Sequence, residues 1–210
     1  MTADATRQLL PRDQRRAQLM RAAAAAFSDA GFAATSMDDV AKAAGITKLI
    51  VYRHFLSKEE LYRAILEETA DRLAQEWIGF TDTEHSEGAA VRTLLTVARE
   101  HPDGFRLLFV HASREPEFSA YQADFRALQL DVADRLVGSA IADPVMRRWA
   151  TNIVIDHLVS SVLTWLDQES PARDDEFVEV ATSTLAAVVR ATVTSQRPRS
   201  VTVLKGEFAV

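Results

Sequence analysis

The chain has 210 residues, with 24 Lys/Arg against 30 Asp/Glu, which gives a formal net charge of −6. It contains no cysteine, so disulfides and thiolate metal sites are excluded. No apolar run approaches the ~18 residues of a membrane span, and the N-terminus lacks the apolar segment of a secretion signal. The sequence therefore predicts a cytoplasmic protein that neither crosses nor binds a membrane.

The first third of the chain carries the spacing and the end signals of helices. Apolar residues at helical spacing and repeated caps predict four helices, over residues 12–30, 37–44, 47–55 and 58–77. Ser36 and Ser57 each begin a capping box that opens the helix after it. Gly31 stands where a helix C-cap belongs, and Gly45 separates the two short helices.

Proline divides the rest of the chain into five more predicted helices. Each helix break is followed at once by a new start at Pro102, Pro116 or Pro144, because the residue before proline avoids the α region. The predicted helices cover residues 89–101, 103–113, 117–138, 144–168 and 174–195. We expect a loop over 78–88, a frayed start over 1–10 and an irregular tail over 196–210. The prediction is an all-α protein of about nine helices.

Charge is unevenly distributed along the sequence. Residues 1–58 hold nine Lys/Arg and five Asp/Glu, whereas residues 59–210 hold 15 Lys/Arg and 25 Asp/Glu. A basic front on an acidic body indicates a polyanion contact confined to the front. A chance distribution over solvated surface is the alternative.

Residues 35–58 read TSMDDVAKAAGITKLIVYRHFLSK and have the pattern of a helix-turn-helix. Gly45 can adopt the positive φ that the turn requires. The second short helix presents polar and large side chains on one face, at positions Thr47, Lys48, Leu49, Tyr52 and Arg53. Such a helix fits the DNA major groove and reads base edges there.

This stretch resembles the DNA-binding domain of the TetR family of bacterial transcriptional regulators. The resemblance covers about residues 12–65, and these positions carry it: Ala25-Ala26-Phe27, Gly31-Phe32, Thr35-Ser36-Met37, Val40-Ala41, Ala44 to Lys48, Val51 to Phe55 and Ser57 to Leu61. It implies a three-helix DNA-binding domain over residues 1–56. A long helix would join it to an effector-binding and dimerisation domain over residues 57–210.

The resemblance also implies roles for single residues. Four of them would read bases: Thr47, Lys48, Leu49 and Tyr52. Five would contact DNA phosphate: Thr35, Ser36, Tyr52, His54 and Lys58. The family often has Gly followed by a small residue after the lysine, whereas this chain has Leu49-Ile50. Leucine and isoleucine can meet thymine methyl groups, or Ile50 can pack inward.

The body is expected to hold a dimer interface and a ligand pocket. The interface predicted on the last two long helices comprises Ile153, Leu158, Ser161, Trp165, Phe177, Leu185, Val188 and Val189. The predicted pocket comprises Trp77, Phe105, Phe109, Tyr121, Phe125, Asn152, Asp156 and His157. The alternative for both sets is an ordinary internal core, because aromatic residues at helical spacing are usually buried.

The sequence thus predicts a transcriptional regulator, expected to be a repressor. A dimer would bind a palindromic double-stranded DNA operator and would be released by a small, largely apolar effector. The alternatives are an architectural DNA-binding protein without an effector, and an activator. The chain carries no catalytic motif, and its five histidines lack metal-ligand spacing, so no enzyme, cofactor or metal is expected.

Overall fold

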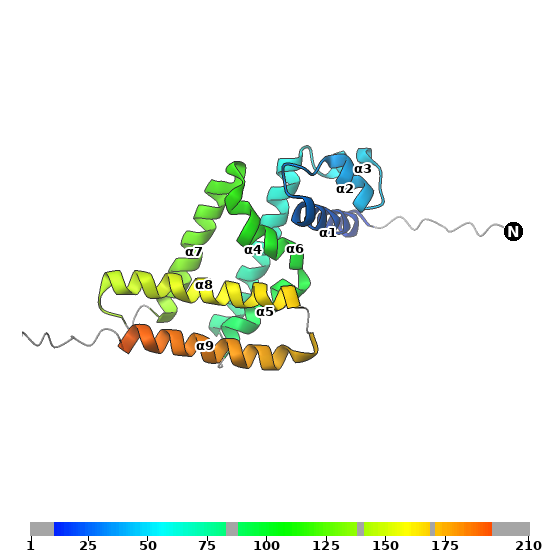
Figure 1. Ribbon diagram of the computed structural model, residues 1–210. Helices are drawn as coiled ribbons and strands as arrows, with labels where there is room; N and C mark the ends of the chain where they lie inside the picture. The colour runs from blue at the N-terminus through cyan, green and yellow to red at the C-terminus, as the bar shows by residue number, and fades with distance from the viewer. Residues whose placement is uncertain (1–10, 83–87, 138–140, 169–170, 195–210) are drawn as a thin grey trace, which may run out of the picture.

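The computed structural model describes residues 11–82, 88–137, 141–168 and 171–194 (Figure 1). These residues form nine α-helices and no strand, which confirms the all-α prediction. The helices are α1 (Arg12–Ala30), α2 (Met37–Ala43), α3 (Lys48–His54), α4 (Lys58–Asp82), α5 (Ala89–Glu100), α6 (Pro102–Arg106), α7 (Ser119–Val137), α8 (Pro144–Gln168) and α9 (Asp174–Thr194). None of them is long and apolar enough to cross a membrane.

Two hydrophobic cores lie at opposite ends of the molecule, and α4 runs between them (Figure 1). The first core joins α1, α2 and α3 to the start of α4, with Phe27, Val51 and Leu61 fully buried. The second core joins α5, α8 and α9, with Val91 and Val162 almost completely buried. A helix that is part of both cores can transmit a change in one to the other.

Helix α4 is longer than the sequence indicated. It continues to Asp82, so the predicted loop over 78–88 is wrong for residues 78–82, and residues 83–87 lie outside the described parts. One glycine inside a helix costs only about 1 kcal/mol relative to alanine, so Gly79 does not end it. The predicted irregular ends over 1–10 and 196–210 also fall outside the described residues.

The single helix predicted over 103–113 is wrong in its geometry. Helix α6 passes at once into a π-helical turn, η1 (Leu107–His111), followed by 3₁₀ turns over Ala112–Arg114 and Pro116–Phe118. A π turn widens the helix and shifts the side chains that follow. Here Leu107 and Leu108 pack in the first core, while Phe109 also contacts the second.

Candidate DNA interface and sensor cavity

Helices α2 and α3 form a compact helix-turn-helix with the predicted cap. The Asp39 amide donates to the Ser36 hydroxyl at 3.2 Å, and the Ser36 amide donates to the Asp39 carboxylate at 3.1 Å. Gly45 adopts a φ of +65°, and the Ile46 amide donates to the Ala41 carbonyl at 3.0 Å across the turn. The turn therefore fixes α3 relative to α2 through backbone bonds.

Helix α3 buries one side and exposes the side predicted to read DNA. Val51 is fully buried, while Lys48 and Arg53 stand exposed at the surface. Leu49 and Tyr52 are 64% and 41% exposed, unusual for large apolar side chains. An exposed apolar face on a short helix is typical of a contact surface, and the sequence predicts the major groove of DNA as its partner.

Two predicted phosphate contacts are engaged inside the protein. Thr35 is buried, and its hydroxyl donates to the Gly31 carbonyl at 2.7 Å. The Lys58 ammonium donates to the Phe32 carbonyl at 2.8 Å and lies 4.3 Å from the centre of the Phe32 ring. Both side chains hold the loop between α1 and α2 in place. Ser36 is exposed at the start of α2, but its hydroxyl also donates to the Asp39 carboxylate at 2.6 Å, and all three phosphate contacts stay predictions.

His54 lies beside a group of arginines that sequence reasoning missed. Partial burial lowers its pKa, and the nearby positive charges of Arg12, Arg16 and Arg15 lower it further. These arginines come from the first turns of α1 and extend the basic surface next to α3. Their signal in the sequence was the basic cluster over residues 12–16, which the helix pattern alone did not place near His54.

An apolar cavity of about 240 Å³ lies between α4, α7 and α8. Three predicted pocket residues line it: Trp77, Phe109 and Phe125. The described lining has no charged side chain, and Gln129 supplies its one amide. The sequence did not predict the other lining residues, which are Ala70, Leu73, Ala74, Leu94, Leu128, Gln129, Val132, Ile155, Leu158 and Val159.

The other predicted pocket residues lie elsewhere. Phe105 is fully buried behind Phe109, with ring centres 4.4 Å apart. Tyr121 packs against the first core, and burial together with Glu67 and Asp71 raises its pKa to about 12. Neither of them lines the described part of the cavity, and the same holds for Asn152, Asp156 and His157.

The polar residues predicted for the pocket form pairs on the outside of the cavity. Arg126 donates to Asn152 at 3.0 Å and contacts the Asp156 carboxylate at 2.7 Å. The His157 imidazole lies 3.0 Å from the Thr184 hydroxyl on α9. These side chains join α8 to α7 and α9, because each points toward a neighbouring helix.

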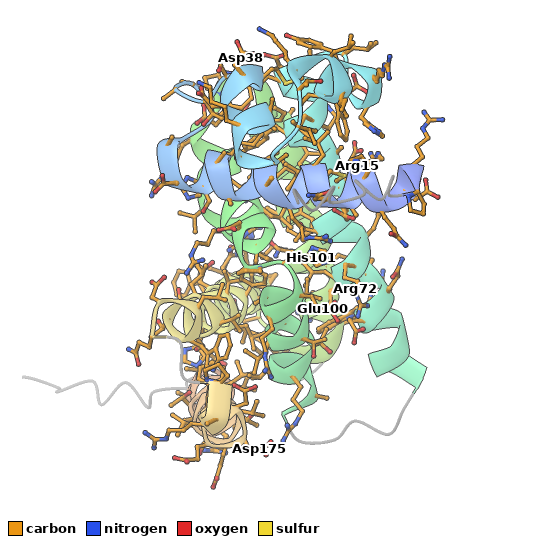
Figure 2. The ribbon with its side chains drawn as sticks, turned by 90° about the vertical axis from the view of Figure 1, so that its right-hand side faces the viewer. Arg15, Asp38, Arg72, Glu100, His101 and Asp175 are labelled. Atoms are coloured by element: carbon orange, nitrogen blue, oxygen red, sulfur yellow. The ribbon has the colours of Figure 1, made fainter. Side chains whose placement is uncertain are left out.

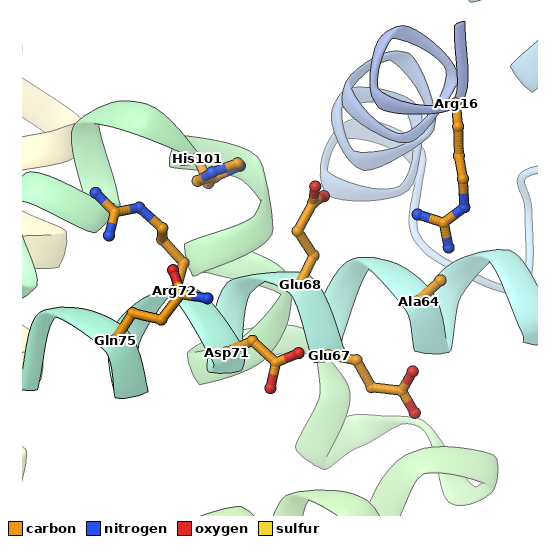
Figure 3. A pocket seen from close by; sticks show the side chains of 8 residues that line it. All are labelled: Arg16, Ala64, Glu67, Glu68, Asp71, Arg72, Gln75 and His101. Atoms are coloured by element: carbon orange, nitrogen blue, oxygen red, sulfur yellow. The ribbon is translucent and has the colours of Figure 1, made fainter. Parts of the chain in front are cut away.

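A polar hollow of about 450 Å³ lies between α1 and α4 (Figure 3). Glu67, Glu68 and Asp71 project from α4 along it, and Arg16 faces them from α1. Deeper along α4, Arg72 contacts Glu76 at 2.5 Å and Glu100 at 2.8 Å, which ties α4 to α5. The lining is charged and partly paired, so the hollow does not suit an apolar ligand.

The predicted dimer residues divide into buried and exposed ones. Leu158 and Trp165 are buried in the second core, so they are not free to meet a partner. Ile153 is 47% exposed, and Ser161, Phe177, Leu185, Val188 and Val189 are half-buried. Sequence reasoning missed two exposed apolar neighbours, Trp149 on α8 and Val180 on α9, at 58% and 63% exposed.

The geometry defines the class of the protein: a helix-turn-helix whose second helix exposes one face, carried on a helical body that contains an apolar cavity. A family model described as bacterial regulatory proteins of the tetR family matches residues 19–65. The HTH-type transcriptional activator FasR of Mycolicibacterium smegmatis is 33% identical over 184 residues, covering 81% of this chain and 80% of the relative. The chain belongs to the tetR family of transcriptional regulators, which is not a class of enzymes.

Solved structures share the same fold. A TetR-like transcriptional regulator from Rhodococcus sp. RHA1 matches with a TM-score of 0.71 and 21% identity, covering 90% of this chain and all of that one. The regulator FadR from Bacillus subtilis, solved with stearoyl-CoA, matches with a TM-score of 0.63 and 16% identity, covering 82% and 97%. At these identities the likeness shows the fold alone.

Proposed function

We propose that this regulator binds a palindromic operator as a homodimer and that an apolar effector in the cavity controls its affinity. One observation carries the proposal: α4 forms a wall of the cavity and also belongs to the DNA-binding core. Leu61 and Leu66 of α4 pack in that core, while Leu73 and Trp77 of the same helix line the cavity. Residues 1–56 would bind DNA and residues 57–210 would sense the effector.

The lining of the cavity favours an effector with a substantial apolar part. Ligand sites are typically apolar with a few placed polar groups, and here Gln129 is in position to orient a ligand. An apolar cavity of about 150 Å³ is enough to bind benzene, so one of 240 Å³ has room for a longer hydrocarbon. The stearoyl-CoA bound by the fold neighbour from Bacillus subtilis supports an acyl chain as the first candidate.

The π turn gives a second route from the cavity to the DNA-binding end. Phe109 lines the cavity, whereas Leu107 and Leu108 on the same turn are buried against the first core. A ligand that displaces Phe109 would therefore shift these leucines and, with them, α1 and α4. Coupling of this kind typically changes affinity about 5- to 150-fold.

The outer face of α8 and α9 is the proposed dimer surface. Trp149, Ile153 and Val180 expose apolar area there, and small side chains such as Ser160 and Ala187 allow close approach of a second copy. Helices α8 and α9 lie at the end of the molecule opposite α3 (Figure 1). A two-fold axis through this face would present two α3 helices to half-sites ~34 Å apart.

Selection of bound sequences from random duplex DNA, at two salt concentrations, tests this function. We expect an enriched palindrome whose half-sites lie about one helical turn apart. Binding without enrichment that vanishes as salt rises would instead favour an architectural DNA-binding protein. Stearoyl-CoA is then added to the complex of the protein with the selected duplex. Control by an acyl ligand predicts that the affinity of the protein for the operator falls.

The double variant Trp149→Lys with Val180→Lys tests the dimer surface. Both side chains are exposed in the protomer, so the fold should persist while the sedimentation coefficient falls to that of a monomer. A dimer that survives both lysines would place the interface elsewhere.

A reporter gene behind the selected operator decides between the expected repressor and an activator. The relative from Mycolicibacterium smegmatis is named as an activator. We place this activity in the cytoplasm.

A further inference from the structure

An ion pair lies on the DNA-facing end of the molecule. The Lys48 ammonium at the start of α3 is 2.9 Å from the Asp38 carboxylate in the first turn of α2. Both side chains are about half exposed, at 51% and 53%. Figure 2 shows Asp38 at the outer end of the molecule, beyond α1 and far from the body. The cap of α2 uses Asp39, so Asp38 is free of that task.

Stability of the fold does not explain this pair. Exposed ion pairs contribute little to folding stability because water screens both charges. A carboxylate at this position is also repelled by DNA phosphates and lowers the affinity for any duplex. A negative charge kept beside the reading helix therefore suggests a contact with the bases themselves.

We propose that Asp38 is a specificity-determining residue and that Asp38 and Lys48 together read one G·C base pair in each half-site. The inference rests on the proposed operator binding by α3. In the major groove, guanine presents the acceptors N7 and O6, and cytosine presents the N4 amino donor. The ammonium would donate to the guanine acceptors while the carboxylate accepts from the cytosine amine.

The spacing of the two charged groups fits this base pair. Guanine O6 and cytosine N4 are joined by a Watson–Crick hydrogen bond, whose usual length is about 2.9 Å. The Lys48 ammonium and the Asp38 carboxylate are separated by the same 2.9 Å. An A·T pair fits less well, because the thymine methyl group lies beside its O4 acceptor and adenine offers only one acceptor, N7.

The pair also keeps Lys48 away from the phosphate backbone. With Asp38 as its partner, the ammonium has an acceptor on random DNA without any phosphate contact. It therefore adds little to sequence-independent binding, which depends on cations that replace counterions. On the matching base pair both groups find partners at once, so the discrimination between sequences increases.

The test compares the wild type with Asp38→Asn and with a control, Asp29→Asn. The control removes the same charge from an exposed position near the C-terminal end of α1, away from α3. Each protein is used to select sequences from random duplex DNA. Its affinity is then measured for the wild-type operator and for duplexes in which each G·C pair is replaced by A·T or inverted.

We expect Asp38→Asn to lose at least about fivefold of the preference for one G·C pair per half-site, since a good base contact is worth that much or more. Its affinity for random DNA should rise, with a salt slope steeper by about 0.9, because Lys48 gains a phosphate. Asp29→Asn should keep the wild-type base preference at every position.

Two results would overturn the proposal. One is an unchanged base preference in Asp38→Asn; the other is an equal rise in affinity for random DNA in both variants, with the same preferred sequence. If the wild type itself enriches no sequence, the proposed operator binding fails, and that outcome is distinct from a failure of the ion pair. Circular dichroism and the melting temperature confirm that each variant is folded.

Discussion

The two ends of the molecule present opposite kinds of binding surface. At the DNA-binding end, the side chains predicted to read bases stand on the outer face of one short helix, and a buried core supports them from behind. In the body, the side chains that line the apolar cavity come from α4, α5, η1, α7 and α8, which are distant in sequence. The comparison shows why a local motif is enough to predict the first surface and why the second becomes visible only in the packed structure.

The largest expected effect is a loss of operator affinity when the exposed face of α3 is changed. Lys48→Ala combined with Tyr52→Ala should lower operator affinity about 100-fold, if each residue makes one good base contact. Both side chains are exposed, so the melting temperature and the oligomeric state should stay unchanged. Fluorescence anisotropy on the selected operator measures the loss. An affinity within a few-fold of the wild type would contradict the reading role of α3.

Filling the apolar cavity with a larger side chain should weaken ligand binding. Ala74→Phe places a ring at the cavity and should lower the affinity for an acyl probe such as stearoyl-CoA at least 10-fold, because the ring occupies the ligand's space. Operator affinity without ligand should remain. Ala127→Phe is the matched control, since Ala127 is an exposed helical alanine on α7 that does not line the cavity. Equal ligand binding by both variants would place the site elsewhere.

The close contact between α6 and α4 can be broken at Gly104. A Cβ there would lie 2.5 Å from the Thr69 hydroxyl, which is buried on α4. Gly104→Ala should lower stability by about 1–3 kcal/mol, the usual result of overpacking. Thermal unfolding measures this change. Thr69→Ala in the same chain should recover part of it; no recovery would mean that another contact is responsible.

A variant of Lys58 distinguishes a structural role of this side chain from a DNA-binding role. If it contacts phosphate, Lys58→Ala flattens the salt dependence of operator binding by about one unit. The structure favours a different result, because the ammonium is already bonded to the Phe32 carbonyl. We therefore expect a lower melting temperature and a salt slope changed by less than half a unit. A full unit of change would restore the sequence-based prediction.

The smallest effect is the pH dependence from His54. Burial and the neighbouring arginines lower its pKa in the free protein. DNA phosphates would raise that pKa, so binding takes up a proton and affinity increases as pH falls between the two values. Operator binding at pH 7.5 and 6.0 should differ a few-fold, and His54→Gln should remove the difference. An identical pH dependence in the variant would exclude His54 as the phosphate contact.

Much of the DNA-binding end follows from neighbouring residues alone. Ser36 with Asp39, and Gly45 at the turn, specify α2 and α3 through bonds that span only a few positions. The apolar spacing then decides which face of α3 remains exposed. What the sequence did not reveal is the pairing of Asp38 with Lys48, because ten residues and a turn separate them.

The sequence by itself determined the helical class, most helix boundaries and which face of α3 is exposed. Those depend on backbone caps, glycine conformation and a period of 3.6 residues, all of which act within one or two turns. Only the tertiary structure revealed the cavity, the π turn and the hydrogen bonds that Lys58 and Thr35 make to the loop between α1 and α2. Each depends on side chains that meet across helices, and a hydrophobic pattern shows that a residue is buried without showing which partner buries it.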